Sequence, residues 1–73
     1  MKKFKLSINH DTVEATIPEN MVWVAQDFNG AVYAYTNEPK CEYEEKPIYG
    51  ILYGESFFIG NLELFYGLKF KIK

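Results

Sequence analysis

The chain contains no arginine, one cysteine and one histidine, and each of these scarcities excludes a class of function. A single cysteine, Cys41, rules out a disulfide within one chain, and with His10 alone it provides no ligand pair of the kind that holds zinc. Arginine is the side chain best shaped to bind phosphate with two parallel hydrogen bonds, so its absence argues against a dedicated phosphate site. We therefore expect no metal centre and no cofactor.

The groups needed for catalysis are equally sparse. Ser7 and Ser56 have no neighbouring base in the sequence to activate them, and His10 lies beside Asp11 in a predicted turn. The five glycines are scattered and form no phosphate-binding loop. The sequence thus predicts that the protein is not an enzyme and has no catalytic residues.

Long apolar runs are also missing. None approaches the length of about 18 residues that a membrane-spanning helix needs, and residues 7–11 interrupt the run that a secretory signal would need. An unpaired thiol fits a reducing compartment, so we expect a cytoplasmic protein with no membrane partner. With 73 residues the chain has room for one domain, residues 1–73, with a thin core. Self-association is the stabiliser that remains, and we expect a homo-oligomer.

What the chain does contain is a two-residue apolar repeat over most of its length, which is typical of β-strands with one solvated face. Residues 4–8 and 13–17 carry this repeat on either side of Asn9-His10-Asp11 and predict a hairpin. Residues 21–26 and 31–36 flank Asp27-Phe28-Asn29-Gly30 and predict a second hairpin. Its turn is either type I ending in a left-handed glycine or a two-residue type I′ turn at Asn29-Gly30.

The second half of the chain divides into a loop and several short strands. Residues 37–47 are acidic and contain Pro39 and Pro47, which predicts an exposed loop or a ragged edge. Strands are predicted at residues 48–53, 57–59, 62–65 and 68–72, with a tight turn at Gly60-Asn61. No long stretch has the period of a helix. The predicted fold class is all-β: a small curled antiparallel sheet or partly open barrel of six to seven short strands.

Charge is segregated along the chain. All ten acidic residues fall between Asp11 and Glu63, whereas six of the eight lysines lie in the two ends. If the two end strands lie side by side, their lysines share one surface opposite in sign to the acidic middle, and such opposed fields steer partners. Lysines on edge strands also block aggregation, so the pattern leaves two interpretations. The six terminal lysines are Lys2, Lys3, Lys5, Lys69, Lys71 and Lys73.

Aromatic side chains make up 18% of the chain, more than a thin core needs. Tyr33 and Tyr35 project from one face of a predicted strand, where exposed rings stack on bases or anchor a protein interface. Trp23 faces either the core or a neighbour, because both faces of its strand are apolar. The candidate binding residues are Lys3, Lys5, Lys69, Lys71, Trp23, Tyr33, Tyr35, Glu42, Glu44 and Glu45.

Residues 23–39 resemble a segment seen in many short proteins of bacteriophages and prophages. The segment consists of Trp23-Val24-Ala25-Gln26-Asp27-Phe28-Asn29-Gly30, followed by Tyr33, Tyr35 and Asn37-Glu38-Pro39. The resemblance implies a phage or prophage origin and a setting in the host cytoplasm, and it carries no catalytic residue. It also implies stoichiometric action, because small phage accessory proteins often bind a host protein or sequester a signal molecule.

Together these observations predict a non-catalytic, phage-type binding protein that acts stoichiometrically on a host factor, for example as an inhibitor of host defence. The expected partner is a host protein or a small anionic signal molecule. The alternative is a small nucleotide or nucleic-acid binding module that uses tyrosine stacking and a lysine patch. A net charge of −2 disfavours long nucleic acid, because nonspecific binding depends on clustered cations. A third interpretation, an acidic DNA mimic, requires the central glutamates to lie at phosphate-like spacing.

Overall fold

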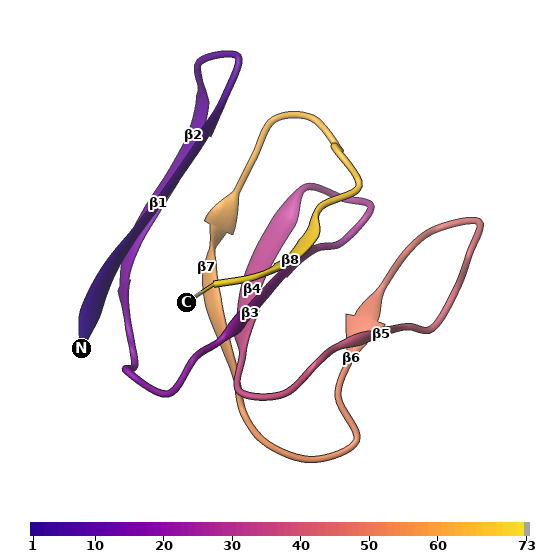
Figure 1. The fold of residues 1–73 in the computed structure, drawn as a ribbon. Coiled ribbons are helices and arrows are strands. Elements are labelled where there is room, and N and C mark those ends of the chain that lie inside the picture. The colour runs from indigo at the N-terminus through magenta and orange to yellow at the C-terminus, as the bar shows by residue number, and fades with distance from the viewer. Residues whose placement is uncertain (73) are drawn as a thin grey trace.

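A computed structural model describes residues 1–72 as an all-β molecule with eight short strands in three antiparallel sheets (Figure 1). Residues 1–72 contain no helix, and so none that is long and apolar enough to cross a membrane. The predicted fold class is confirmed, and no sheet within these residues closes into a barrel. The strands are β1 (Lys2–Ile8), β2 (Asp11–Ile17), β3 (Trp23–Gln26), β4 (Ala31–Tyr35), β5 (Lys40–Cys41), β6 (Tyr49–Gly50), β7 (Ser56–Asn61) and β8 (Lys69–Lys71).

β1 and β2 form the first predicted hairpin. Their pairing runs without a break from Lys2 opposite Ile17 to Ile8 opposite Asp11. Asn9 and His10 have positive φ angles of 50° and 69°, the conformation of a two-residue turn whose twist matches that of the strands. The turn is one residue shorter than predicted, because Asp11 already belongs to β2.

The central sheet has the strand order β7-β4-β3-β8, and its middle two strands are the second predicted hairpin. The amide of Gly30 donates to the carbonyl of Asp27 at 3.0 Å, and Gly30 is the one residue of this turn with positive φ, 96°. The turn is therefore the type I form ending in a left-handed glycine. A side chain at position 30 would also collide with the carbonyl oxygen of Leu62.

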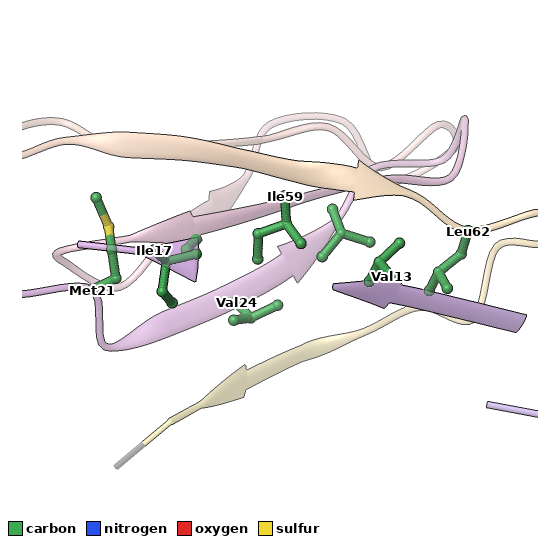
Figure 2. Packing of buried hydrophobic residues seen from close by; sticks show 8 residues of the cluster. Val13, Ile17, Met21, Val24, Ile59 and Leu62 are labelled. Carbon is green, nitrogen blue, oxygen red and sulfur yellow. The ribbon is translucent and has the colours of Figure 1, made fainter. Parts of the chain in front are cut away.

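The hydrophobic core lies between the β1–β2 hairpin and one face of the central sheet. Figure 2 shows Val13 and Ile17 of β2 among side chains of the sheet, including Val24 and Ile59. In β1 and β2 every second residue points into this layer, which is why the two-residue repeat locates this part of the core correctly. The fully formed cluster consists of Val13, Ile17, Met21, Val24, Val32, Ala34, Ile59 and Leu62.

The structure corrects three details in the second half of the chain. Gly60 and Asn61 do not turn but continue β7, paired with Val32 and Ala31. The register shifts beside Ile59, which is thereby kept in the core at the bulge. Residues 62–65 form no strand, and within residues 48–53 the strand is limited to β6.

The amide of Leu62 still donates to the carbonyl of Gly30 at 2.9 Å, but side chains and not a strand ladder hold residues 63–66. The carboxylate of Asp11 accepts hydrogen bonds from the amides of Glu63 and Leu64 and from the hydroxyl of Tyr66, at 2.8 to 3.1 Å. The buried side chain of Gln26 accepts from the amide of Tyr66 at 2.7 Å and donates to the carbonyl of Leu64 at 2.8 Å. These polar contacts satisfy backbone groups that would otherwise pair in a sheet.

The Asp11 contact predicts a specific loss of stability at low pH. Hydrogen bonds from the Glu63 amide and from Tyr66 hold the pKa of Asp11 below its ordinary value of 3.8. The ionised carboxylate therefore stabilises the fold above that value, and the stabilisation disappears as the pH falls through the lowered pKa. We expect Asp11→Asn to lower the thermal midpoint at about pH 7. The decrease of the midpoint between about pH 7 and about pH 2.5 should then be smaller in this variant than in the wild type.

Glu14→Gln is the matched control for this measurement, because Glu14 lies on the same strand and is exposed on its outer face. Thermal melts of the wild type and both variants at the two pH values test the prediction. A midpoint difference between the two pH values that is the same in Asp11→Asn as in the wild type would contradict it.

Residues 36–55 form an arm that leaves the central sheet after β4 and returns to it at β7. Figure 1 shows the arm and the β1–β2 hairpin on opposite sides of the central sheet. Its two strands pair at only two positions, and of the described residues in this arm none belongs to the hydrophobic cluster. Three contacts fasten it to the rest of the molecule: the Tyr49 amide donates to the Asp27 carboxylate at 3.0 Å, the Phe28 amide to the Pro47 carbonyl at 2.8 Å, and the Lys69 ammonium to the Glu38 carboxylate at 2.9 Å. The Thr36 amide donates to the Glu55 carbonyl at 3.0 Å and closes the base of the arm.

Candidate binding surfaces

The lysines of the first strand lie on the outer face of the β1–β2 hairpin. Lys3 and Lys5 are exposed and alternate with Phe4, which packs against the core. Because successive side chains of a strand point to opposite faces, both lysines point away from the central sheet. Lys2 points the other way, and its ammonium donates to the carbonyl of Met21 at 2.8 Å.

The lysines of the last strand lie on the opposite side of the molecule. Lys69 and Lys71 alternate with Phe70, whose ring stacks on that of Phe4 with 6.4 Å between the centroids. The two chain ends therefore meet across the core, but β8 pairs with β3 and not with β1. The expected single lysine surface is thus not formed by Lys69 and Lys71 together with the lysines of β1. Lys73 lies outside the described residues.

The structure brings the three aromatic candidates together on the outer face of the central sheet. Trp23 lies opposite Tyr35 in the β3–β4 pairing. The ring of Tyr33 lies 6.3 Å from that of Tyr35 and 5.3 Å from that of Phe58, measured between centroids. This row of rings continues to Lys69, whose ammonium lies 5.8 Å from the centroid of Trp23.

The covered part of this face is not available for stacking on a base. Tyr35 is only 3% exposed, and Pro39 of the arm is among the fully buried residues. Burial raises the pKa of the Tyr35 hydroxyl far above its ordinary value, and nearby acidic groups and tyrosines raise it further. The neighbours that contribute are Asp27, Tyr33, Glu42 and Tyr49.

The positive charge at the edge of this face is partly neutralised within the chain. Lys69 donates to the carboxylate of Glu38 at 2.9 Å, and Lys40 lies 3.6 Å from the other oxygen of that carboxylate. The hydrogen bond from Lys69, with the charge of Lys40, lowers the pKa of Glu38 below its ordinary value. Glu38 therefore stays ionised, and Lys69 is less free to bind an external anion than its sequence position indicates.

An open groove lies between the arm and the β3–β4 turn, with a volume of about 650 Å³. We call it the arm groove. The three glutamates predicted as candidates lie around this groove. The ammonium of Lys46 also lies there, 5.9 Å from the ring centroid of Phe28. The described residues that line it are Phe28, Glu42, Tyr43, Glu44, Glu45, Lys46 and Ile48.

The sequence analysis missed the apolar members of the arm groove. Phe28 is the clearest, because it occupies a turn position and stays 42% exposed. A turn residue that cannot reach the core is a signal that was available in the sequence. Tyr43 and Ile48 are separated from the two-residue repeat by charged residues and proline, so no pattern indicated that they share a site with Phe28.

The arm also exposes large apolar side chains away from the groove. Leu52 is 97% exposed and Tyr53 is 73% exposed, and Tyr43 at the groove is 66% exposed. Large apolar side chains are also exposed outside the arm, at Met1, Phe58, Leu64 and Phe65, but the most exposed one, Leu52, belongs to the arm.

No family model matches the sequence, and no curated protein or solved structure matches it. Within residues 1–72 no group of three or more His, Cys, Asp or Glu side chains is arranged to hold a metal ion. The fold and the groove define a small all-β protein with an apolar, acid-rimmed arm.

Proposed function

We propose that the protein is a non-catalytic binding protein that acts stoichiometrically on a protein partner, and that the arm is the contact segment. The observation that carries this proposal is the arm itself. It adds no residue of the described chain to the hydrophobic cluster, yet it is fastened to the sheet and exposes Tyr43, Leu52 and Tyr53. A fastened segment that does little for the core is best explained by what it presents to a partner.

The phage-like segment of residues 23–39 supplies the setting of the proposal. On this resemblance we propose a host protein as the partner and the host cytoplasm as the place. Inhibition of host defence is a function that stoichiometric binding can perform. Self-association belongs to the same proposal, because a chain of 73 residues buries only a thin core.

The nucleotide-binding alternative receives less support from the geometry. Tyr35 is covered, Lys69 is paired with Glu38, and Lys3 and Lys5 lie on the opposite side of the molecule. Stacking rings and cations that converge on one ligand are what such a module needs. The geometry gives less support to a small anionic signal molecule as the partner for the same reason.

Affinity capture from bacterial lysate, followed by reconstitution with the purified partner, tests the proposal. Native mass spectrometry is expected to show a complex of fixed stoichiometry. We expect the double variant Tyr43→Ser, Leu52→Ser to weaken this complex by about tenfold or more, because exposed apolar anchors dominate interface energies. The control is Lys3→Ala, Lys5→Ala on the opposite side, which should bind as the wild type does. A complex that survives in the arm variant would refute the arm as the contact segment.

A further inference from the structure

The arm groove combines apolar and acidic side chains in one lining. Aromatic and aliphatic side chains form its lining together with three carboxylates, and Lys46 is its one cation among the described residues. Its formal charge is therefore −2, on a lining that is mainly apolar. The apolar members are Phe28, Tyr43 and Ile48, and the carboxylates belong to Glu42, Glu44 and Glu45.

One ammonium of the groove lining lies near an aromatic ring of the same lining. The Nζ atom of Lys46 lies 5.9 Å from the centroid of the Phe28 ring, within the range of a cation–π contact. The contact is exposed and intramolecular, so it is worth little and can be exchanged for a similar contact from outside. This contact indicates the kind of group that fits beside the Phe28 ring: a cation on an apolar stem.

The size of the groove limits the occupant further. Its volume of about 650 Å³ falls in the range of roughly 300 to 1,000 Å³ that holds small ligands and peptide side chains. It is open to solvent along one side, which suits an extended chain that inserts one or two side chains. A guanidinium is planar, stacks on an aromatic ring and is less strongly hydrated than an ammonium, so it has an advantage over Lys46 for the same position.

We infer that the arm groove binds an arginine or lysine side chain on an extended segment of the protein partner, which displaces Lys46 from the ring of Phe28. This inference deepens the proposed function and rests on it. The negative charge left in the groove complements a basic segment and repels an acidic one. An apolar residue next to the cation would pack against Tyr43 and Ile48.

Two five-residue peptides test the charge requirement directly. Both carry leucine on each side of the central residue, which is arginine in one and the neutral isostere citrulline in the other. Titration of the ¹⁵N-labelled full chain, followed by amide chemical shifts, should place the arginine peptide at Phe28 and residues 42–48. The citrulline peptide should bind more weakly by about fivefold or more, because it lacks the charge that the carboxylates attract.

Two substitutions should change the affinity for the arginine peptide in opposite directions. Phe28→Ala removes the ring and should weaken binding by about two- to fivefold. Lys46→Met keeps an apolar stem but removes the competing ammonium, so it should tighten binding by a similar factor. Glu55→Gln, outside the groove lining, is the matched control and should leave the affinity unchanged. Thermal midpoints of all variants confirm that they are folded.

Three results would overturn the inference. Equal binding of the arginine and citrulline peptides would remove the charge requirement. Weaker binding in Lys46→Met would mean that Lys46 contributes to the site instead of competing for it. A homo-oligomer whose self-association is lost in Lys3→Ala, Lys5→Ala and in Phe28→Ala would place a second copy of this chain in the groove.

The peptide titration and the capture experiment fail in different ways. If a captured partner is lost in the Tyr43→Ser, Leu52→Ser variant but the peptides show no charge preference, the arm is the contact segment and the groove chemistry is wrong. If no partner is captured and the arginine peptide still binds at the groove as described, the proposed function fails while the site stands as a binding site for basic peptides.

Discussion

Replacing Ile17 with alanine is expected to lower the free energy of unfolding by about 2–5 kcal/mol. Ile17 is fully buried at the end of β2 and is among the largest buried side chains. Small domains have about 0.05–0.15 kcal/mol of stability per residue, or roughly 4–11 kcal/mol for this chain. The loss is therefore a large part of the total, and much of the variant population should be unfolded under mild denaturing conditions.

The reason for so large an effect is the position of Ile17 between two layers. The β1–β2 hairpin is held by side-chain packing to the central sheet rather than by a strand pairing with it. A cavity at Ile17 weakens the contact that keeps the hairpin on the sheet, and an isolated two-stranded hairpin has little stability in water.

Leu52→Ala is the matched control for Ile17→Ala, because it also removes a large aliphatic side chain but at a position that is 97% exposed. Urea denaturation followed by tryptophan fluorescence measures both variants. The control should stay within about 0.5 kcal/mol of the wild type. If Ile17→Ala has the same free energy of unfolding as Leu52→Ala, the description of a hairpin held on the sheet by packing is wrong.

Gln26→Leu is expected to cost about 2–3 kcal/mol, although leucine has a similar volume and is apolar. The side chain of Gln26 is fully buried and forms hydrogen bonds with the amide of Tyr66 and the carbonyl of Leu64. Leucine leaves both backbone groups without these partners. The cost is the desolvation of polar groups, and the gain in apolar burial does not offset it.

Hydrogen exchange distinguishes this mechanism from a general loss of packing. The amide of Tyr66 should exchange faster in Gln26→Leu by a larger factor than the amides of β3 and β4, because its own acceptor is removed. Asn20→Ala, in an exposed turn, serves as the control and should not change exchange at Tyr66. Equal acceleration at all sheet amides would indicate global destabilisation alone.

The sequence predicts the first half of this fold well, for a physical reason. In residues 1–17 the strands alternate apolar and polar side chains, and in residues 21–36 two apolar strands flank a clear turn sequence. Each turn contains residues that tolerate positive φ, such as Asn9 and Gly30. Local rules are sufficient there, because each strand pairs with its neighbour in the chain.

The second half is predicted less well because its order comes from distant partners. Residues 62–65 look like a strand in their composition, yet Glu63 and Leu64 are held by hydrogen bonds with the side chains of Asp11 and Gln26, which are remote in sequence. Likewise, Gly60 looks like a turn residue but lies inside β7, where a Cβ would approach the side chain of Val13 to 3.3 Å. Such long-range contacts leave no periodic signal in the sequence.

For the candidate binding residues the same distinction applies. The three glutamates of the central segment were found from composition, and the structure places them around one groove. The lysines were assigned to one surface because both end strands alternate in the same way. That alternation determines which side of its own strand each lysine occupies. It does not show that the two strands lie in opposite layers with their apolar faces toward each other.

The way in which the arm is fastened has a consequence for how this chain can change. Few polar contacts join residues 36–55 to the remainder: the hydrogen bond to the Asp27 carboxylate, the backbone pair of Phe28 and Pro47, and the ion pair of Glu38 and Lys69. The buried cluster draws on other residues. On the proposed function, substitutions in residues 41–48 would alter the contact with the partner while the sheet folds as before. We then expect variation among descendants of this sequence to concentrate in these residues, so that a new partner is bound through changes in the arm and not in the sheet.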